Sequence, residues 1–274
     1  MATRVTLADV PPATLALARL VVGSLALSPL ARRETSSPPP TRRDRWTLAW
    51  MGIVGFGAAF ILGNWGIAAS TATNAALLIV VEPVSLMLLG PALLGERLTR
   101  REALAAALAV GGALLVVVNG IPGVTERLVP HWRGDLLLVL SGLAYASYSL
   151  LGRRVLDRHA AGRVTASSIL WGALAMLPLA LGEWLAGRRP VWTWAAVAGT
   201  LYLALVVTAL GYLVWNWALR RVKAARAAIF LCVQPVAGAL LGVVLLGEPL
   251  TVFTLLGGGL IVGGLALAFG SVAR

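Results

Sequence analysis

Residues 80–99, VVEPVSLMLLGPALLGERLT, return in altered form as residues 231–251, LCVQPVAGALLGVVLLGEPLT. The proline, the glycine–glutamate pair, the leucine and the final threonine of the first stretch recur 152 residues later without a gap. The same offset relates Asn64-Trp65 to Asn216-Trp217 and Gly111-Gly112 to Gly263-Gly264. An internal repeat in an apolar chain is typical of membrane proteins that are built from two related halves.

The composition predicts an all-α, polytopic helical membrane protein. The chain is 59% hydrophobic, has a mean hydropathy of +0.86 and is only 12% charged, against about 25% charged in a typical soluble domain. The net charge of +12 is carried mostly by basic residues between the apolar runs, where anionic lipid attracts them. The sequence therefore indicates a lipid bilayer as partner and no nucleic acid.

Residues that bind metals or attack substrates are scarce. The sequence has a single cysteine, Cys232, which lies inside an apolar run. One cysteine excludes an intramolecular disulfide and a cysteine cluster. Both histidines, His131 and His159, fall in predicted loops. The sequence therefore predicts no metal site, no cofactor and no catalytic triad.

Nine apolar runs are long enough for spanning helices, which need about 20 residues each. Four of them form a first half, residues 1–122: 11–31, 46–68, 72–94 and 103–119. Five form a second half, residues 134–274: 134–151, 164–186, 193–219, 224–246 and 252–273.

The basic residues orient these helices. Seventeen of them lie on one predicted side of the membrane: five in 32–45, three in 97–101, four in 153–163, four in 220–226, and Arg274. The other side has five: Arg4, Arg127, Arg133, Arg188 and Arg189. The positive-inside rule then predicts an outside N-terminus and a cytoplasmic C-terminus in a bacterial-type inner membrane. This orientation requires an odd number of spans, as counted.

A second offset extends the repeat toward the N-terminus. Residues 23–31, GSLALSPLA, resemble residues 172–180, GALAMLPLA, 149 residues later. The run 11–31 thus corresponds to 164–186, and the run 134–151 has no counterpart. A complete version has five helices per half, and since five is odd, the halves are inverted. We expect an in-frame apolar run of about 20 residues upstream of Met1; the alternative is a protein of nine spans.

Three short motifs resemble the EamA family of the drug/metabolite transporter superfamily: GERLT at 95–99, GEPLT at 247–251 and GLAYASYSLLGRRVL at 142–156. The resemblance implies an inner-membrane carrier with ten helices, often an exporter of amino acids or other small metabolites by alternating access. It implies no enzymatic activity. The alternative is a non-transporting membrane scaffold or an intramembrane enzyme.

Two charged residues fall near the centres of predicted spans. Glu82 lies mid-way along 72–94 beside Pro83, where a charge costs roughly 2.5–3.5 kcal/mol, so it should face a cavity or a partner. It is a candidate proton-coupling carboxylate; the alternative is a protonated or salt-bridged structural glutamate. Gln234 holds the equivalent position, which makes any coupling asymmetric. Arg19 is predicted either to pair with Glu82 or to bind a carboxylate of the substrate.

Aromatic and amide residues within the spans are candidates for lining a substrate cavity: Asn64, Tyr145, Tyr148, Tyr212 and Asn216. Such a cavity suits a small amphipathic or cationic solute. For Tyr145, Tyr148 and Asn216, a place in the belt at the membrane interface stays equally open. The pattern fits amino acids, aromatic metabolites and organic cations alike.

Overall fold

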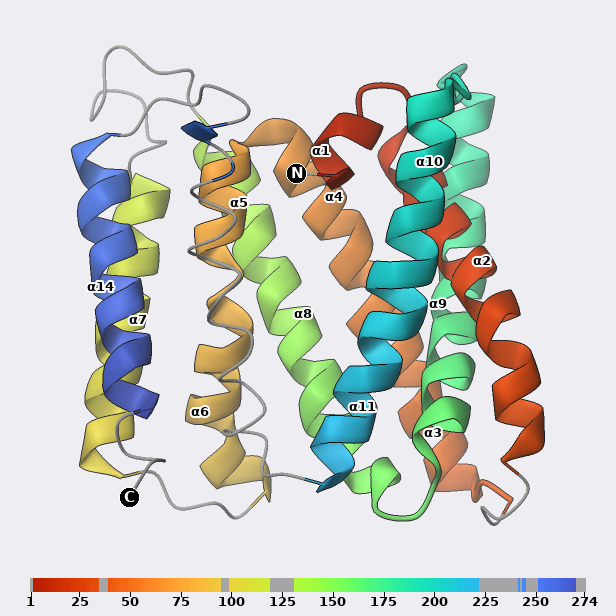
Figure 1. Cartoon of the computed structure of the whole chain (residues 1–274), viewed down its shortest axis with the longest axis horizontal. Coiled ribbons are helices and arrows are strands. Elements are labelled where there is room, and N and C mark those ends of the chain that lie inside the picture. Colours follow the sequence, from red (N-terminus) through yellow and green to blue (C-terminus); the bar gives the residue numbers. More distant parts are fainter. Residues whose placement is uncertain are drawn as a thin grey trace. The chain divides into compact units, whose positions relative to one another are not determined.

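The computed structural model describes residues 2–34, 39–94, 99–118, 131–221, 241, 243–244 and 251–269. Every regular element within these residues is a helix (Figure 1). Five helices are long and apolar enough to cross a membrane: Pro12–Arg33, Arg42–Ala69, Trp132–Leu156, Ala161–Leu185 and Trp194–Arg221. Three shorter apolar helices accompany them, Ala72–Leu86, Ala103–Val116 and Val252–Gly264. The all-α, multi-pass membrane fold is confirmed, while the predicted helix 224–246 lies almost wholly outside the described residues.

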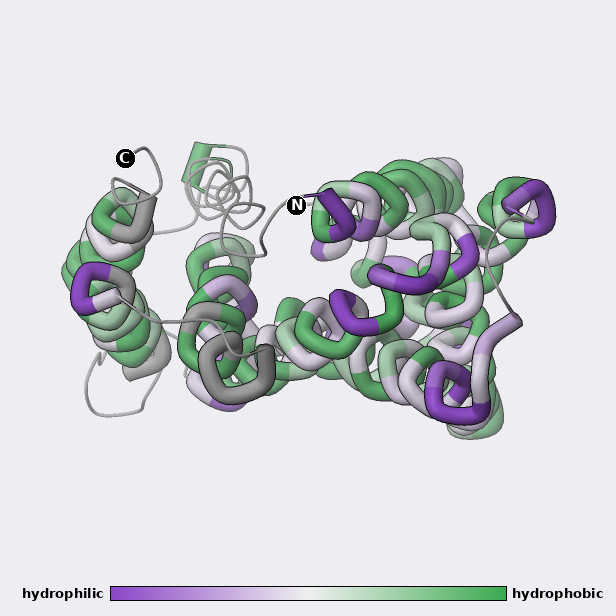
Figure 2. The backbone as a smooth tube through the Cα atoms, turned by 90° about the horizontal axis from the view of Figure 1, so that it is seen from below, coloured by the Kyte–Doolittle hydropathy of each residue, from purple (hydrophilic) through white to green (hydrophobic). Residues whose placement is uncertain are grey.

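The chain forms two compact units. Unit 1 comprises Met1, Trp65–Ala146 and Ala224–Arg274, and unit 2 comprises Ala2–Asn64 and Ser147–Lys223. Each unit thus takes segments from both predicted halves of the sequence, and the two sequence halves stay a prediction. Figure 2 shows hydrophobic residues along most of the helices and hydrophilic ones gathered at helix ends, as expected for helices in lipid.

Unit 2 holds most of the long helices. They are α1 (Ala2–Thr6), α2 (Pro12–Arg33), α3 (Arg42–Trp50), η1 (Met51–Ala58), part of α4 (Ala59–Ala69), part of α8 (Trp132–Leu156), α9 (Ala161–Leu185), α10 (Trp194–Tyr202), η2 (Leu203–Leu210) and α11 (Gly211–Arg221). Unit 1 holds the rest of α4 and α8, with α5 (Ala72–Leu78), α6 (Val81–Leu94), α7 (Arg100–Val118) and α14 (Val252–Phe269).

The repeat is visible in the boundaries of the elements. The three consecutive segments α3, η1 and α4 begin and end 152 residues before α10, η2 and α11. The middle segments, η1 and η2, are both π-helical and both eight residues long. The helices α2 and α9 begin 149 residues apart, at Pro12 and Ala161. Both offsets found in the sequence therefore relate elements of the same kind, and the 152-residue offset also relates elements of the same length.

Helices α2 and α9 run antiparallel, because each begins where the other ends. The Glu183 carboxylate, near the end of α9, accepts hydrogen bonds from the backbone N–H groups of Ala13 (2.9 Å) and Thr14 (2.8 Å). The Glu34 carboxylate, just past α2, accepts one from the N–H of Arg163 (2.8 Å) near the start of α9. Each carboxylate satisfies N–H groups that the first turn of a helix leaves without an intrahelical partner. Repeat-related helices of unit 2 are thus inverted with respect to each other (Figure 1).

Helices α7 and α14 of unit 1 pack against each other at glycines, which have no side chain to separate the two backbones. A Cβ atom on Gly112 would lie 2.5 Å from the carbonyl oxygen of Gly257, and one on Gly264 would lie 2.6 Å from that of Ala105. The residue numbers rise along α7 as they fall along α14, so this pair is antiparallel as well. Glycine at these contacts lets the two backbones approach closely, as in other membrane helix pairs.

The stretch predicted as one helix, 72–94, is interrupted at residues 79–80. Helix α5 ends at Leu78 and α6 begins at Val81. Pro83 therefore lies in the first turn of α6, where a missing N–H costs no helical hydrogen bond. The break packs closely against α8, since a Cβ on Gly142 would lie 2.7 Å from the Cβ of Val81.

Candidate functional site

A buried arginine lies among the helices of unit 2. Arg19 of α2 is 6% exposed, and its Nε and Nη2 donate to the Thr208 hydroxyl at 3.3 and 3.2 Å. The Thr208 hydroxyl gives its own proton to the Leu203 carbonyl, five residues earlier in η2 (2.8 Å), which leaves its lone pairs for the arginine. The guanidinium carbon also lies 4.2 Å from the ring centroid of Phe60, a cation–π distance.

Four aromatic rings extend from this arginine into the unit. Phe56 packs 5.6 Å from Phe60, 4.8 Å from Tyr148 and 4.6 Å from Tyr212, measured between ring centroids. Tyr148 and Tyr212 lie 5.6 Å apart in an edge-on arrangement. Phe56 and Tyr148 are fully buried. The rings form one continuous aromatic group, contributed by η1, α4, α8 and α11.

A buried amide lies at the other side of this group. Asn216 is 0% exposed, and its Nδ2 donates to the Tyr148 hydroxyl (2.6 Å) and to the Thr165 hydroxyl (2.8 Å). Tyr212 precedes it by four residues on α11, so both side chains share one face of that helix. We call the set of Arg19, Thr208, Phe56, Phe60, Tyr148, Tyr212, Thr165 and Asn216 the central cluster.

Four of the eight predicted site residues meet in this cluster: Arg19, Tyr148, Tyr212 and Asn216. A fifth, Asn64, belongs to the same unit and is 2% exposed, but its Nδ2 donates to the backbone carbonyl of Pro12 (2.8 Å). That contact gives Asn64 a structural role at the start of α2, and a part in a cavity stays a prediction.

The other three candidates do not join the described cluster. Glu82 and Tyr145 belong to unit 1, and both are half-buried. Glu82 lies in the first turn of α6, directly after the helix break, rather than in the middle of a continuous helix. Because Arg19 belongs to unit 2, the pairing of Arg19 with Glu82 stays a prediction. Gln234 lies outside the described residues.

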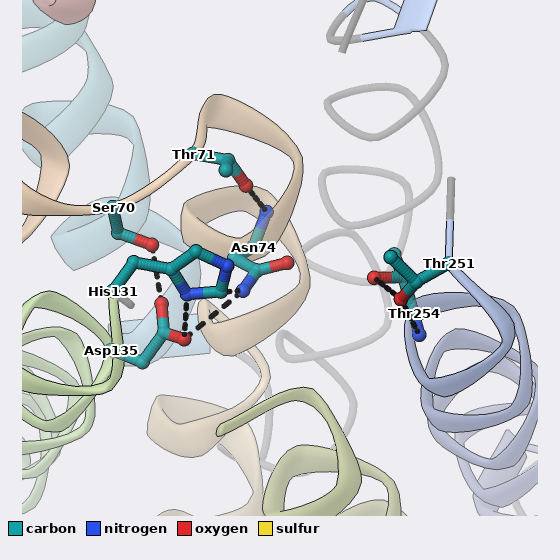
Figure 3. A network of polar contacts seen from close by, with 7 residues as sticks. All are labelled: Ser70, Thr71, Asn74, His131, Asp135, Thr251 and Thr254. Carbon is teal, nitrogen blue, oxygen red and sulfur yellow. Dashed lines mark hydrogen bonds and ion pairs between the residues drawn. The ribbon is translucent and has the colours of Figure 1, made fainter. Parts of the chain in front are cut away.

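Both histidines lie in buried polar networks that we did not predict. His131 Nδ1 lies 2.8 Å from Asp135 Oδ2, and Asn74 Nδ2 donates to the same oxygen at 3.0 Å (Figure 3). The Ser70 hydroxyl donates to the other oxygen of Asp135. The four-residue spacing of His131 and Asp135, one helical turn, was the available sequence signal. The network ties α8 to the start of α5.

The second histidine network belongs to unit 2. Asp44, in the first turn of α3, accepts from Arg158 Nη2 at 2.7 Å and lies 3.3 Å from His159 Nε2. Thr41 and Asp44 also form a reciprocal cap at the start of α3. Asp44 is separated from His159 by 115 residues, so no local pattern predicts this contact. Neither network resembles a metal centre: the described part of the chain holds no group of three His, Cys, Asp or Glu side chains placed to bind an ion.

The chain is similar to known membrane transporters along nearly its whole length. The model of the EamA-like transporter family matches residues 1–118 and 132–270. A probable terminal-alkyne amino-acid exporter of Streptantibioticus cattleyicolor is 31% identical over 268 residues, which cover 97% of this chain and 86% of that protein. A probable amino-acid metabolite efflux pump of Salmonella typhimurium is 29% identical over 199 residues, 70% of this chain and 65% of the pump.

One solved crystal structure shares the fold. It matches with a TM-score of 0.70 at 23% sequence identity and covers 100% of this chain and 92% of its own.

Proposed function

Because the chain belongs to the EamA-like transporter family, we propose that it is a secondary carrier that exports a small amino-acid-like metabolite. As a multi-pass membrane transporter it has a small-molecule substrate and a lipid bilayer around it. Two relatives are named as an exporter of an amino acid and an efflux pump for amino-acid metabolites. These names support the substrate class, and the family supports a transporter rather than an enzyme.

The observation that carries this proposal is the central cluster. A buried guanidinium in a membrane helix attracts an anionic group, which fits the carboxylate of an amino acid. The aromatic group of Phe56, Tyr148 and Tyr212 provides the apolar and π-rich surface for the rest of the solute. Asn216 supplies a polar atom at the far side of these rings. Charge, aromatic surface and amide in one unit are the groups that recognise a zwitterion.

The inverted helix pairs support alternating access. The central cluster takes Arg19 from α2 and Thr165 from α9, and these two helices are repeat-related and antiparallel. It also takes Phe56 from η1 and Thr208 from η2, the two π-helical segments. Repeat-related elements that surround one site can exchange their conformations, which opens the site first to one side of the membrane and then to the other.

The positions of the basic residues support the proposed orientation in a bacterial-type inner membrane. Within unit 2, the end of α2, the start of α3, the turn between α8 and α9 and the end of α11 all lie at the lower edge of Figure 1. These segments carry Arg32, Arg33, Arg42, Arg43, Arg158, Arg220 and Arg221. A basic edge of this kind faces the cytoplasm, which supports the proposed orientation for the helices of unit 2.

Glu82 is the proposed proton-coupling group. It directly follows a break between two short helices, where irregular backbone within a span is tolerated only if protein or water surrounds it. Discontinuous helices of this kind are common at the substrate and ion sites of secondary transporters. Proton binding at Glu82, with the uncharged Gln234 at the equivalent position, couples export to the proton gradient in one repeat only.

The test is flux from proteoliposomes that contain the full chain and an equimolar mixture of the twenty proteinogenic amino acids. We expect wild-type protein to release a subset of them faster when a pH gradient is applied. Glu82→Gln should keep the downhill flux and lose the acceleration by the gradient. No amino-acid flux from wild-type vesicles would contradict the exporter function, whereas full gradient-driven flux in Glu82→Gln would contradict only the role of Glu82.

A further inference from the structure

We propose that the side-chain oxygen of Asn216 binds the ammonium group of the substrate, so that this carrier selects solutes with an amine over solutes without one. The proposal rests on the transport function above and assigns one step of substrate recognition to one atom. It comes from the hydrogen bonds around the amide, which fix its orientation and leave that atom without a donor.

The hydroxyl of Thr165 determines which way the amide points. A threonine hydroxyl has a single proton, and Thr165 donates it to the carbonyl of Ala161 at 2.7 Å. Its contact with Asn216 at 2.8 Å must therefore be a bond that it accepts from Nδ2. The same nitrogen donates to the Tyr148 hydroxyl. With both protons of Nδ2 used, Oδ1 points away from these two hydroxyls.

Oδ1 of Asn216 is a buried acceptor with no partner. No donor from the described residues reaches it, although the side chain is 0% exposed. A buried acceptor without a donor is costly, and native proteins leave few of them. An N–H group of a bound solute that reaches Oδ1 removes this cost.

The residues of the central cluster favour a cationic donor. Tyr212 lies one turn earlier on the same helix, and its ring packs against those of Phe56 and Tyr148. The faces of aromatic rings attract an ammonium group, while an amide oxygen, which only accepts, repels a carboxylate. The two effects together select a positively charged N–H donor. The positively charged Arg19, the proposed partner of the substrate carboxylate, lies beside Phe60 in the same cluster.

The experiment measures retention of matched solutes by the purified full chain. The probe is an equimolar mixture of the twenty proteinogenic amino acids and their des-amino carboxylic acids, quantified by mass spectrometry after gel filtration. We expect wild-type protein to retain amino acids over their des-amino partners by about 10-fold or more. In Asn216→Leu, which has similar volume and no acceptor, the ratio should fall to about 1.

A second variant and a control separate recognition from folding. Asn216→Asp keeps an acceptor, to which the Tyr148 hydroxyl can donate, and the amine preference should persist or rise. Ser168→Ala removes a buried hydroxyl whose hydrogen bonds, among the described residues, go to carbonyls of its own helix at 2.8 and 3.1 Å, and it should keep the wild-type ratio.

Two outcomes overturn the inference alone: a wild-type protein that retains both sets of solutes equally, or an Asn216→Leu variant that keeps the wild-type ratio. If Asn216→Leu does not fold, loss of the preference in Asn216→Asp also overturns it. Wild-type protein that retains neither set overturns the proposed exporter function, and the inference with it.

Discussion

Asn64 and Asn216 occupy equivalent positions of the two repeats, yet their amides have different partners. Asn64 donates directly to the carbonyl of Pro12, the first residue of α2. The equivalent carbonyl in the second repeat is that of Ala161, the first residue of α9. There the hydroxyl of Thr165 donates to that carbonyl, and Asn216 donates to the oxygen of the threonine instead. One asparagine holds two helices together, and its counterpart is displaced from that contact.

The cause is a single hydroxyl. At the 149-residue offset, the counterpart of Thr165 is Ala16, which is fully buried and has no polar side chain. In the first repeat nothing comes between the asparagine and the carbonyl. In the second, the threonine does, and the amide turns toward Tyr148. The two copies of one position thus differ: one asparagine makes a structural contact, and the other becomes a candidate binding group.

The largest expected effect concerns another difference between the repeats. Arg19 corresponds to Ser168 at the 149-residue offset, so only the first repeat carries the buried charge. Arg19→Leu should lower amino-acid flux in proteoliposomes about 100-fold, because the carboxylate of the solute loses its charged partner. Ser168→Ala should stay within about 2-fold of wild type, since in the described part of the chain its hydroxyl bonds within α9. Equal losses in the two variants would show that the repeats share the role.

The next effect tests the displaced amide. Thr165→Ala should let Asn216 bond directly to the carbonyl of Ala161, as Asn64 does with Pro12. The side-chain geometry of the second repeat then becomes that of the first, and the preference for amino acids over des-amino acids should drop about 10-fold in the retention measurement. An unchanged preference would mean that the hydroxyl of Thr165 does not set the orientation of Asn216.

The smallest effect concerns a feature in which the repeats agree. Glu183→Gln and Glu34→Gln each replace a carboxylate with a neutral amide, which weakens the hydrogen bonds to the first N–H groups of the partner helix. Each should destabilise the protein by about 1 kcal/mol in thermal unfolding. The two substitutions lie at opposite ends of the α2–α9 pair, so the double variant should lose about the sum. A loss of stability in only one of the two single variants would show that the two caps are not equivalent.

The sequence predicted the overall architecture well because that architecture depends on long patterns. Apolar runs of sufficient length predicted the spanning helices, and the 152-residue offset relates elements with matching boundaries. The break between α5 and α6 and the π-helical segments escaped prediction. Hydropathy distinguishes apolar from polar surroundings, but it carries no information on which carbonyl accepts the hydrogen bond of each backbone N–H.

The candidate site was predicted only in part, for a related reason. A charge, a tyrosine or an amide in an apolar run is conspicuous, which led to Arg19, Tyr148, Tyr212 and Asn216. Thr165 and Thr208 decide how two of these side chains are held, but a threonine in a membrane helix is common and bonds to its own backbone in most places. The glutamate caps join residues more than 120 positions apart, a distance at which a single sequence gives no signal.

The reciprocal caps of α2 and α9 have the form of a contact between identical molecules. Each helix has a carboxylate at its end and N–H groups without intrahelical partners at its start. Two copies of one such helix, packed side by side in antiparallel orientation, therefore form this carboxylate–N–H contact at both ends. A surface with this property is self-complementary, the geometry of an isologous dimer. A half-length ancestor with this helix would already fit an inverted copy of itself, and fusion of the two genes would need no new interface.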